Sequence, residues 1–319
     1  MDTRRLKSFL KIVDTGSLTR AAAALNIAQP ALSQQLQSLE AHFRQKLLIR
    51  SQQGVTPTEA GRVLYRHAQA ILKQFEQAEA DVKRSSTSLS GHVSVGLAPY
   101  SAGGTLSLAL LKAARETHPD IMLHIVEGFA VAFSELIMNG RIDMAVMQGA
   151  GPMRGVSFQP LLVEEFFLVT PIEVPFPGAA QSAIPLADLV GIPLMLPSKL
   201  NFVRRAVDAA FASIHQSPNI VAEVESLGTL RDAVAEGTGS TILPWSVACQ
   251  IATPTRSVIR AISSPTIEET VSVCVSDQMP LSEAAVAIRN VLLDIALTAA
   301  RSGRWQAPKD AAEIGRAHV

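Results

Sequence analysis

The chain has 319 residues, of which 48% are hydrophobic and 18% are charged. These values exclude a fibrous or intrinsically disordered chain and predict two globular domains rather than one. The net charge is zero, yet residues 1–90 carry 13 Lys and Arg against 7 Asp and Glu, and residues 91–319 carry 15 against 21. Unless this asymmetry is chance drift, a basic N-terminal module on an acidic body indicates a head that binds nucleic acid.

The cysteines and the N-terminus give expectations about the cellular compartment. Cys249 and Cys274 lie in apolar runs without pairing or metal-ligand spacing, so we expect buried, reduced thiols of a cytoplasmic protein. The N-terminus lacks the apolar core of a signal peptide, and no apolar run is long enough to span a membrane. These features argue against an extracellular solute receptor.

Three short helices are predicted at the N-terminus. Residues 3–14 form the first, and Ser17 is a good N-cap for the second. Asn26 suits a left-handed turn at the end of the second helix, and Gln29 and Pro30 begin the third. The apolar residues of the third helix recur with helical spacing and are expected in the core: Leu32, Leu36, Leu39 and Phe43.

The opposite face of the third helix is rich in uncharged hydrogen-bonding groups. It carries Pro30, Ser33, Gln34, Gln37 and Arg44. Amide and hydroxyl side chains on a helix of this kind are suited to read base edges in a major groove. The alternative is an ordinary solvated helix face. The preceding helix and tight turn favour a helix-turn-helix, with nucleic acid as the leading partner.

A short hairpin and a long helix are predicted next. Leu47–Arg50 and Val55 bracket the hairpin, with residues 52–54 at its tip, which is typical of the wing of a winged helix-turn-helix. The stretch Thr56-Pro57-Thr58-Glu59 matches a capping box whose first residue is the cap. It begins a helix that extends to about Ser85.

This long helix has an apolar seam with heptad spacing. The seam consists of Leu64, Ala68, Ile71, Phe75, Ala78 and Val82. Heptad spacing predicts pairing with a second copy of the same helix. The alternative is a helix packed on its own domain. The Ser-rich stretch 85–91 that follows is expected to be a hinge.

From His92 onward, strand and helix patterns alternate. Alternation of this kind predicts a parallel sheet with covering helices, arranged as two α/β lobes with a ligand cleft between them. Residues 301–319 are polar and aperiodic, and we expect a disordered tail. The expected strands are 92–98, 121–128, 142–149, 166–171, 193–197, 220–224, 240–244 and 269–277, and the expected helices are 107–119, 131–140, 202–214, 227–237 and 282–300.

Two stretches resemble a known family. ALNIAQPALSQQLQSLE, followed by LLIRSQQGVTPTEAG, is similar to the LysR-type bacterial transcriptional regulators, and most like their nitrogen-assimilation-control branch. The resemblance covers about residues 4–295. It implies an α+β multidomain fold: an N-terminal winged helix-turn-helix with a long linker helix, then a two-lobed α/β effector domain like the type II periplasmic binding proteins.

The resemblance also implies domain boundaries and partners. The winged helix-turn-helix covers residues 1–58, the dimerisation helix and hinge cover 59–90, the effector domain covers 91–300, and a flexible tail covers 301–319. Within the effector domain, lobe I is expected at about 91–163 and 266–300, and lobe II at about 164–265. The implied protein is a cytoplasmic activator or repressor of nitrogen or small-molecule metabolism. It binds promoter DNA as a homodimer or homotetramer, with RNA polymerase as a further partner and no cofactor.

Residues expected to contact DNA come from the resemblance and from the residues themselves. The resemblance places base contacts on the third helix and an arginine, Arg50, at the foot of the wing. Many family members have Arg where this chain has Gln34, and Gln pairs well with adenine whereas Arg favours guanine. The backbone N–H groups at the start of the second helix can bind a phosphate. The alternative is that the residues there only cap the helix. The full set is Ser17, Thr19, Gln29, Pro30, Ser33, Gln34, Gln37, Arg50, Gln52 and Gln53.

The effector cleft is predicted around the loop that follows the first strand of the α/β region. Its backbone N–H groups, at the start of a helix, suit an anionic ligand. The expected residues are Pro99, Tyr100, Ser101, Ala102, Gly103, Gly128, Phe129, Met147, Gln148, Phe202, Ser226 and Thr229. Several are apolar and few charges converge. Either the effector is small and partly apolar, or there is none and the domain only oligomerises.

Signatures of catalysis are weak in this chain. It has no GxSxG elbow, no phosphate-binding P-loop and no histidines at metal-ligand spacing, so we expect neither an enzyme nor a metal site. The pairs Glu164-Glu165 and Glu268-Glu269 are sequence neighbours, which point to opposite faces of a strand. A cytosolic solute-binding protein with an accessory helical head, and a transferase on the same fold, are the alternative functions.

Overall fold

The computed structural model describes residues 2–51, 54–83, 89–149, 151, 153–174 and 183–301. The predicted wing-tip residues Gln52 and Gln53, most of the predicted hinge and nearly all of the predicted tail lie outside these residues. Two compact units make up the chain, one built mainly from Met1–Thr87 and the other mainly from the residues after Ser88.

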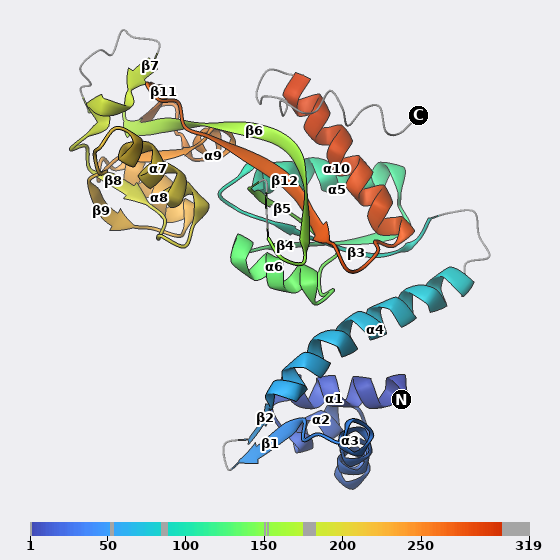
Figure 1. Cartoon of the computed structure of the whole chain (residues 1–319). Coiled ribbons are helices and arrows are strands. Elements are labelled where there is room, and N and C mark those ends of the chain that lie inside the picture. Colours follow the sequence, from blue (N-terminus) through green and yellow to red (C-terminus); the bar gives the residue numbers. More distant parts are fainter. Residues whose placement is uncertain are drawn as a thin grey trace. The chain divides into compact units, whose positions relative to one another are not determined.

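The first unit has the helices and hairpin that the sequence predicts (Figure 1). The Ser17 side chain accepts a hydrogen bond from the Arg20 amide at 3.4 Å and caps the second helix, as predicted. Asn26 has a φ of 53°, the predicted left-handed turn. The elements are α1 (Thr3–Thr15), α2 (Leu18–Ala24), α3 (Gln29–Phe43), β1 (Leu48–Ser51), β2 (Gly54–Pro57) and α4 (Glu59–Lys83).

The buried face of α3 differs from the prediction at its C-terminal end. Leu32, Leu36 and Leu39 lie in the core of the first unit, as predicted. The prediction was wrong for Phe43, which is 38% exposed and contacts the ring of His42 edge-on. Phe43 is the last residue of the helix, so little of the unit lies beside it. The fourth buried side chain of α3 is instead Glu40, which is 9% exposed.

The start of α4 also corrects a prediction. Thr56 was predicted as the helix cap, but it pairs with Ile49 in the β1–β2 hairpin. The backbone of Thr56 is therefore part of a strand and not of the helix start. The Thr58 side chain accepts a hydrogen bond from the Gly61 amide at 3.0 Å, and Thr58 is the residue that caps the helix. The first helical residue is Glu59.

The apolar seam of α4 divides into two parts. Leu64 and Ala68 are buried in the core of the first unit, together with side chains of α1. These two residues were predicted to contact a second copy of the chain, and that prediction was wrong because α1 already covers them. Ile71, Phe75 and Val82 are exposed. Ala78 is exposed as well.

The second unit contains an eight-stranded sheet. Its order is β4-β3-β5-β12-β6-β11-β7, and β10 also pairs with β6. β3 is parallel to β4 and β5, whereas β12 is antiparallel to β5 and β6. The strands are β3 (Gly91–Leu97), β4 (Ile121–Glu127), β5 (Met144–Gln148), β6 (Val156–Pro171), β7 (Ala183–Pro185), β10 (Thr241–Pro244), β11 (Ser257–Ser263) and β12 (Glu268–Ser276).

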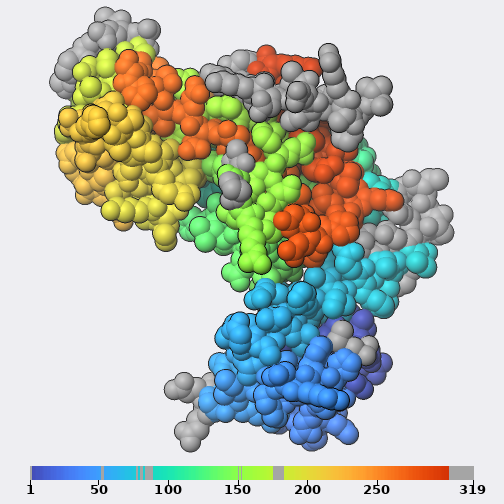
Figure 2. Space-filling view, viewed as in Figure 1, coloured from blue at the N-terminus to red at the C-terminus, as the bar shows by residue number. Residues whose placement is uncertain are grey.

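The two long strands β6 and β12 connect the two lobes (Figure 1). In the space-filling view, the orange surface of β11 and β12 runs beside the green surface of β6 (Figure 2). The sequence predicted β6 only from Phe166, but the strand begins at Val156. Pro160 and the Glu164-Glu165 pair interrupt the apolar pattern, which concealed the first part of the strand.

Lobe I covers both faces of its part of the sheet with helices. α5 (Ala102–Thr117) and α10 (Glu283–Arg301) share one core with Val93, Val95 and Leu97 of β3. α6 (Ala130–Met138) packs on the other face through Phe133. Gly96 permits this contact, because a Cβ atom there would lie 2.8 Å from the Phe133 ring.

Lobe II has its own core and several elements that the sequence did not predict. Among the missed elements are β7, η1, α9 and β11. The remaining elements are η1 (Leu186–Leu189), β8 (Leu194–Leu196), α7 (Phe202–Ser213), β9 (Ile220–Glu223), α8 (Leu227–Ala235) and α9 (Trp245–Ile251). β8 and β9 form a two-stranded parallel sheet.

The two cysteines have different environments. Cys274 on β12 is buried as predicted, and burial raises the pKa of its thiol to about 12. Cys249 on α9 is exposed, so the prediction that both thiols are buried was wrong. α9 is a short helix that turns this position away from the lobe core formed by Val247, Ala248 and Ile251.

Candidate nucleic-acid interface and inter-lobe cleft

The outer face of α3 presents the side chains that the sequence singled out. Gln29, Pro30, Gln34 and Gln37 are exposed, and Ser33 is half-buried. The three leucines behind them are buried in the core of the first unit. This arrangement holds the helix from one side and leaves its amide groups in solvent, so they are available to a duplex groove.

The wing lies against both α3 and the turn between α1 and α2. The Arg50 guanidinium donates a hydrogen bond from Nη2 to Ser33 Oγ at 3.2 Å. The Val55 amide donates to the Gly16 carbonyl at 2.9 Å. Gly54 has a φ of 124°, and a Cβ atom there would lie 2.6 Å from the Gly16 carbonyl oxygen, so only glycine fits. The wing and α3 therefore form one continuous polar surface.

The start of α2 adds further polar groups. The Ser17 hydroxyl caps the helix, which leaves Thr19 exposed beside it. Arg20 is also exposed, and its Nη2 donates to the Thr15 carbonyl. Arg20 was not among the predicted DNA contacts. A single cation inside an alanine-rich helix gave no signal until the structure placed it beside the helix start.

The predicted anion cradle at the start of α5 already has internal acceptors. Ser101 Oγ accepts from the Gly103 amide at 2.9 Å and donates to the Ala98 carbonyl at 2.9 Å. The Ala102 amide donates to Glu164 Oε2 at 2.7 Å. An anionic effector at Ser101, Ala102 and Gly103 would therefore have to replace acceptors that the chain itself supplies.

A small cavity lies between the lobes. Its volume is about 20 Å³, which is room for about one water molecule. Five predicted effector residues line it: Pro99, Tyr100, Gly128, Phe129 and Phe202. Five others line it that were not predicted: Ala98, Ala130, Leu200, Asn201 and Arg205. The sequence shows two adjacent arginines in α7 but not which of them faces the cleft.

Arg204 and Arg205 have different environments in the structure. Arg204 is buried and pairs with Asp208 and Glu223, each at 3.0 Å. Arg205 lines the inter-lobe cavity. Burial raises the pKa of the Glu269 carboxyl group, and the positive charge of Arg205 partly opposes this. The cleft therefore contains a cation, Arg205, that was not among the predicted effector residues.

Tyr100 connects the two lobes across the cavity. The side chain is 1% exposed, and its hydroxyl donates to the Val224 carbonyl at 3.0 Å. Burial, and then the negative charge of Glu225, raise the pKa of this phenol. Tyr100 is therefore a neutral hydrogen-bond donor that links the two lobes beside the cavity.

The other predicted effector residues do not line this cavity. Met147 is buried in the core beneath α6. Gln148 is buried, and within the described residues both polar atoms of its amide have no hydrogen-bond partner. Ser226 and Thr229 are exposed, and Ser226 Oγ caps α8 by accepting from the Thr229 amide at 3.2 Å.

The two glutamate pairs meet across neighbouring strands. Glu164 lies opposite Glu269, and Glu165 lies opposite Glu268. Burial, and then the charge of Glu268, raise the pKa of Glu165. Glu164 is 1% exposed and accepts hydrogen bonds from the Ala102 amide and the Ser246 hydroxyl. It therefore joins α5 of lobe I to α9 of lobe II.

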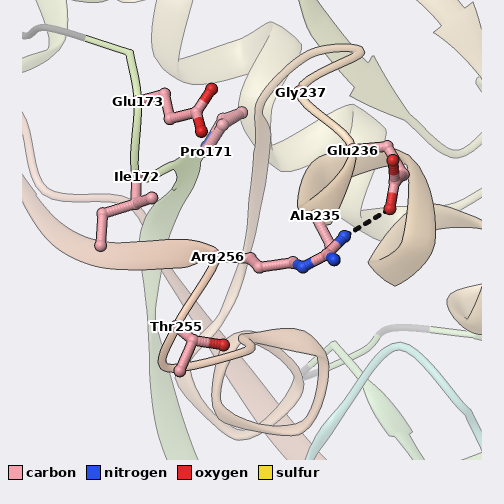
Figure 3. A pocket seen from close by; sticks show the side chains of 8 residues that line it. All are labelled: Pro171, Ile172, Glu173, Ala235, Glu236, Gly237, Thr255 and Arg256. Carbon is pink, nitrogen blue, oxygen red and sulfur yellow. Dashed lines mark hydrogen bonds and ion pairs between the residues drawn. The ribbon is translucent and has the colours of Figure 1, made fainter.

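A second pocket lies at the far end of lobe II, with a volume of about 400 Å³ (Figure 3). Arg256 and Glu236 both line it and form a direct ion pair of 2.5 Å, so the cation is already neutralised. The other lining residues are Pro171, Ile172, Glu173, Ala235, Gly237 and Thr255. None of the predicted effector residues lies there.

The described residues contain neither a cluster of metal ligands nor a membrane-spanning helix. No group of three or more His, Cys, Asp and Glu side chains in them is placed to hold a metal ion. Among the helices of that part of the chain, none has the length and apolar character needed to cross a bilayer.

Comparison with family models matches both units. Residues 3–62 match the model described as bacterial regulatory helix-turn-helix protein, lysR family. Residues 86–296, about two thirds of the chain, match the LysR substrate binding domain. The chain belongs to the LysR family. It is a LysR-type transcriptional regulator with a helix-turn-helix head and an effector-binding domain.

Individual LysR-family relatives match nearly the whole chain. It is 40% identical to the nitrogen assimilation regulatory protein nac of Klebsiella aerogenes, over 92% of this chain and 95% of the relative. It is 39% identical to the protein of the same name from Escherichia coli (strain K12), over 96% of this chain and 99% of the relative. A full-length variant of OxyR from Pseudomonas aeruginosa has the same fold, with a TM-score of 0.72, 24% identity and coverage of 93% and 94%.

Proposed function

We propose that this LysR-family regulator reads operator DNA with the outer face of α3 in the major groove. Gln34 and Gln37 contact base edges, and Gln29, Pro30 and Ser33 lie at the groove surface. The observation that carries the proposal is an exposed amide and hydroxyl face backed by buried leucines in a head of net positive charge. Gln34 would favour adenine, because one side-chain amide can donate to N7 of that base and accept from its N6 amino group.

Phosphate contacts flank the base readers in this proposal. Arg50 binds the backbone next to the groove, and Ser17 and Thr19 bring the start of α2 to a second phosphate. The predicted wing-tip contacts Gln52 and Gln53 lie outside the described residues and stay a prediction. Contacts of this kind fix the register of the head on DNA without reading sequence.

Substitution of Gln34 tests the base-reading role. We expect Gln34→Ala to cost about 1–3 kcal/mol on the specific duplex and to relax specificity at one base position. Binding to a scrambled duplex should stay unchanged. Fluorescence anisotropy with both duplexes, over a range of salt concentrations, measures the difference. Equal losses on the two duplexes would reject Gln34 as a base reader.

Target genes are proposed from the relatives. Because two relatives are named as nitrogen assimilation regulatory proteins, we propose that this chain controls genes of nitrogen or small-molecule metabolism. Gel shifts with DNA from upstream of its own gene and of divergent neighbouring genes are the direct test. Failure to bind any double-stranded DNA at low ionic strength would contradict the DNA-binding function itself.

The effector is proposed to bind between the lobes. Phe129, Phe202 and Arg205 at the cavity suit a small, partly apolar anion. Calorimetry with small carboxylates and nitrogen metabolites tests it. Absence of heat with the whole panel would favour a domain that only oligomerises.

We further propose the assembly and cellular setting. The head covers residues 1–58, the linker helix and hinge cover 59–90, and the effector domain covers 91–300. Paired linker helices form a cytoplasmic dimer of dimers that acts on promoter DNA and not as an enzyme. Bending such a site costs on the order of 1–6 kcal/mol, so a modest change in head spacing is enough to switch it.

A further inference from the structure

Glu40 is a buried carboxylate at an unfavourable end of a helix. It lies in the last turn of α3, where the helix dipole repels negative charge, and it is 9% exposed. A buried charge is retained only where partners compensate for its lost hydration. Glu40 must therefore have partners of this kind.

Its partners all belong to the base of the wing. Glu40 Oε1 accepts from the Leu47 amide at 2.9 Å and from the Leu48 amide at 3.4 Å, and Oε2 accepts from Lys46 Nζ at 2.9 Å. Burial acts to raise the pKa of Glu40, but these hydrogen bonds outweigh it and hold the pKa below its usual value. Glu40 is therefore ionised at neutral pH and attaches the end of α3 to the start of β1.

The opposite side of the same segment is held by the start of α4. Thr58 Oγ1 donates to the Lys46 carbonyl at 2.7 Å, and the Thr58 amide donates to the Leu47 carbonyl at 2.9 Å. Gly61 permits this close approach, because a Cβ atom there would lie 2.0 Å from the Leu47 carbonyl oxygen. We call this arrangement of Glu40, Thr58 and residues 46–48 the wing bracket.

The wing bracket controls where Arg50 lies. β1 begins at Leu48, within the bracket, and reaches Arg50 two residues later. Arg50 then contacts Ser33, two helical turns before Glu40 on α3. β1 is thus joined to α3 at two points, and Glu40 supplies the buried one. Without it, the wing would be held against α3 by the exposed contact to Ser33 and by the packing of Leu47 and Leu48 in the core of the head.

We propose that Glu40 is a positioning residue for DNA binding, which sets the wing so that Arg50 meets phosphate while α3 occupies the groove. The proposal depends on the DNA-binding role proposed above for Arg50. Glu40 itself does not touch DNA in this scheme. It binds residues 46–48 and thereby positions Arg50. Its effect on DNA affinity therefore depends on the phosphate contact of Arg50.

A double-mutant cycle tests this coupling. Glu40→Gln keeps the side-chain shape but loses the charge that binds Lys46 and both amides. We expect it to weaken binding of the full-length protein to matched and scrambled duplexes alike, by about tenfold. In an Arg50→Ala background the same substitution should have little further effect, because coupled residues are not additive. A merely structural role would give the same loss in both backgrounds, and that outcome would overturn the proposal.

Two controls make the result unambiguous. Glu59→Gln removes one carboxylate from an exposed ion pair with Arg62 outside the bracket, so it reports the effect of charge removal alone. We expect this control to leave affinity unchanged or slightly raised. Thermal unfolding of each variant checks the fold. If Arg50→Ala alone has no effect on DNA binding, both the role of Arg50 and this proposal fail. If only Glu40→Gln is silent, this proposal fails and the role of Arg50 stands.

Discussion

At Arg50 a single side chain links the wing to the recognition helix. Its guanidinium contacts Ser33, which was itself predicted to contact DNA. On DNA, Arg50 can exchange this neutral acceptor for a phosphate oxygen, which makes a stronger, charge-assisted bond. In the function proposed above, Arg50 therefore contacts phosphate, and Ser33 holds its guanidinium in the free protein.

Substitution of Arg50 should separate affinity from specificity. We expect Arg50→Ala to weaken binding to matched and scrambled duplexes by the same factor and to reduce the slope of log affinity against log salt by about 1. The reason is that one phosphate contact releases about one counterion. Anisotropy titrations at several salt concentrations measure both quantities. A loss confined to the matched duplex would show that Arg50 reads bases instead.

Among the elements, α4 combines two roles along its length. Its first turns complete the core of the head through Leu64, Ala68 and Leu72. Farther along, Ile71 and Phe75 are 39% and 42% exposed. Heptad spacing predicted one continuous seam, but the head uses the first part of it. The remaining part, from Ile71 to Val82, is the surface that we propose for pairing with a second chain.

Substitution on this surface should weaken the dimer without unfolding the head. We expect Phe75→Ser to raise the dissociation constant by about tenfold or more, since burial of a Phe side chain is worth about 1.5–3 kcal/mol. Val63→Ser is the matched control, because Val63 is 40% exposed on the same helix but lies off the seam. Sedimentation equilibrium measures both variants. Equal effects of the two substitutions would argue against a specific seam.

At the scale of the whole molecule, the effector-binding domain is held together by contacts that cross between its lobes. Tyr100 donates to the Val224 carbonyl, and Glu164 accepts from Ala102 and Ser246. β6 and β12 carry the chain through both lobes. A ligand that widens the small cavity must break the hydrogen bond between Tyr100 and the Val224 carbonyl. The hydrogen bonds of Glu164 are different, because Glu164 lies on β6, which connects the lobes.

Loss of Glu164 should destabilise this domain markedly. Glu164→Ala leaves two buried donors without their acceptor, so we expect the free energy of unfolding to fall by about 2–6 kcal/mol, from about 1–3 kcal/mol for each donor. Ser246→Ala removes one donor and keeps the other bond, and it should cost less. Urea unfolding followed by circular dichroism measures both. A smaller loss for Glu164→Ala than for Ser246→Ala would contradict this account.

The sequence alone determined the elements of the head and the outer face of α3. Helical periodicity and local capping decide these features, and both depend on residues within a few positions of one another. Ser17, Asn26 and the three leucines of α3 therefore lie where the pattern places them. The alternating strand and helix patterns, together with the family resemblance, predicted the two-lobed domain, which the structure and the family models confirm.

Only the tertiary structure decided how distant residues are used. Glu40 can be buried because the Leu47 and Leu48 amides and the Lys46 ammonium group supply its donors. Leu64 and Ala68 entered the head core because α1 covers them. The Ala102 amide at the start of α5 is not free for an anion because Glu164, far along the chain, accepts from it. Burial and hydrogen-bond satisfaction depend on which segments meet, and a local pattern carries no information about that.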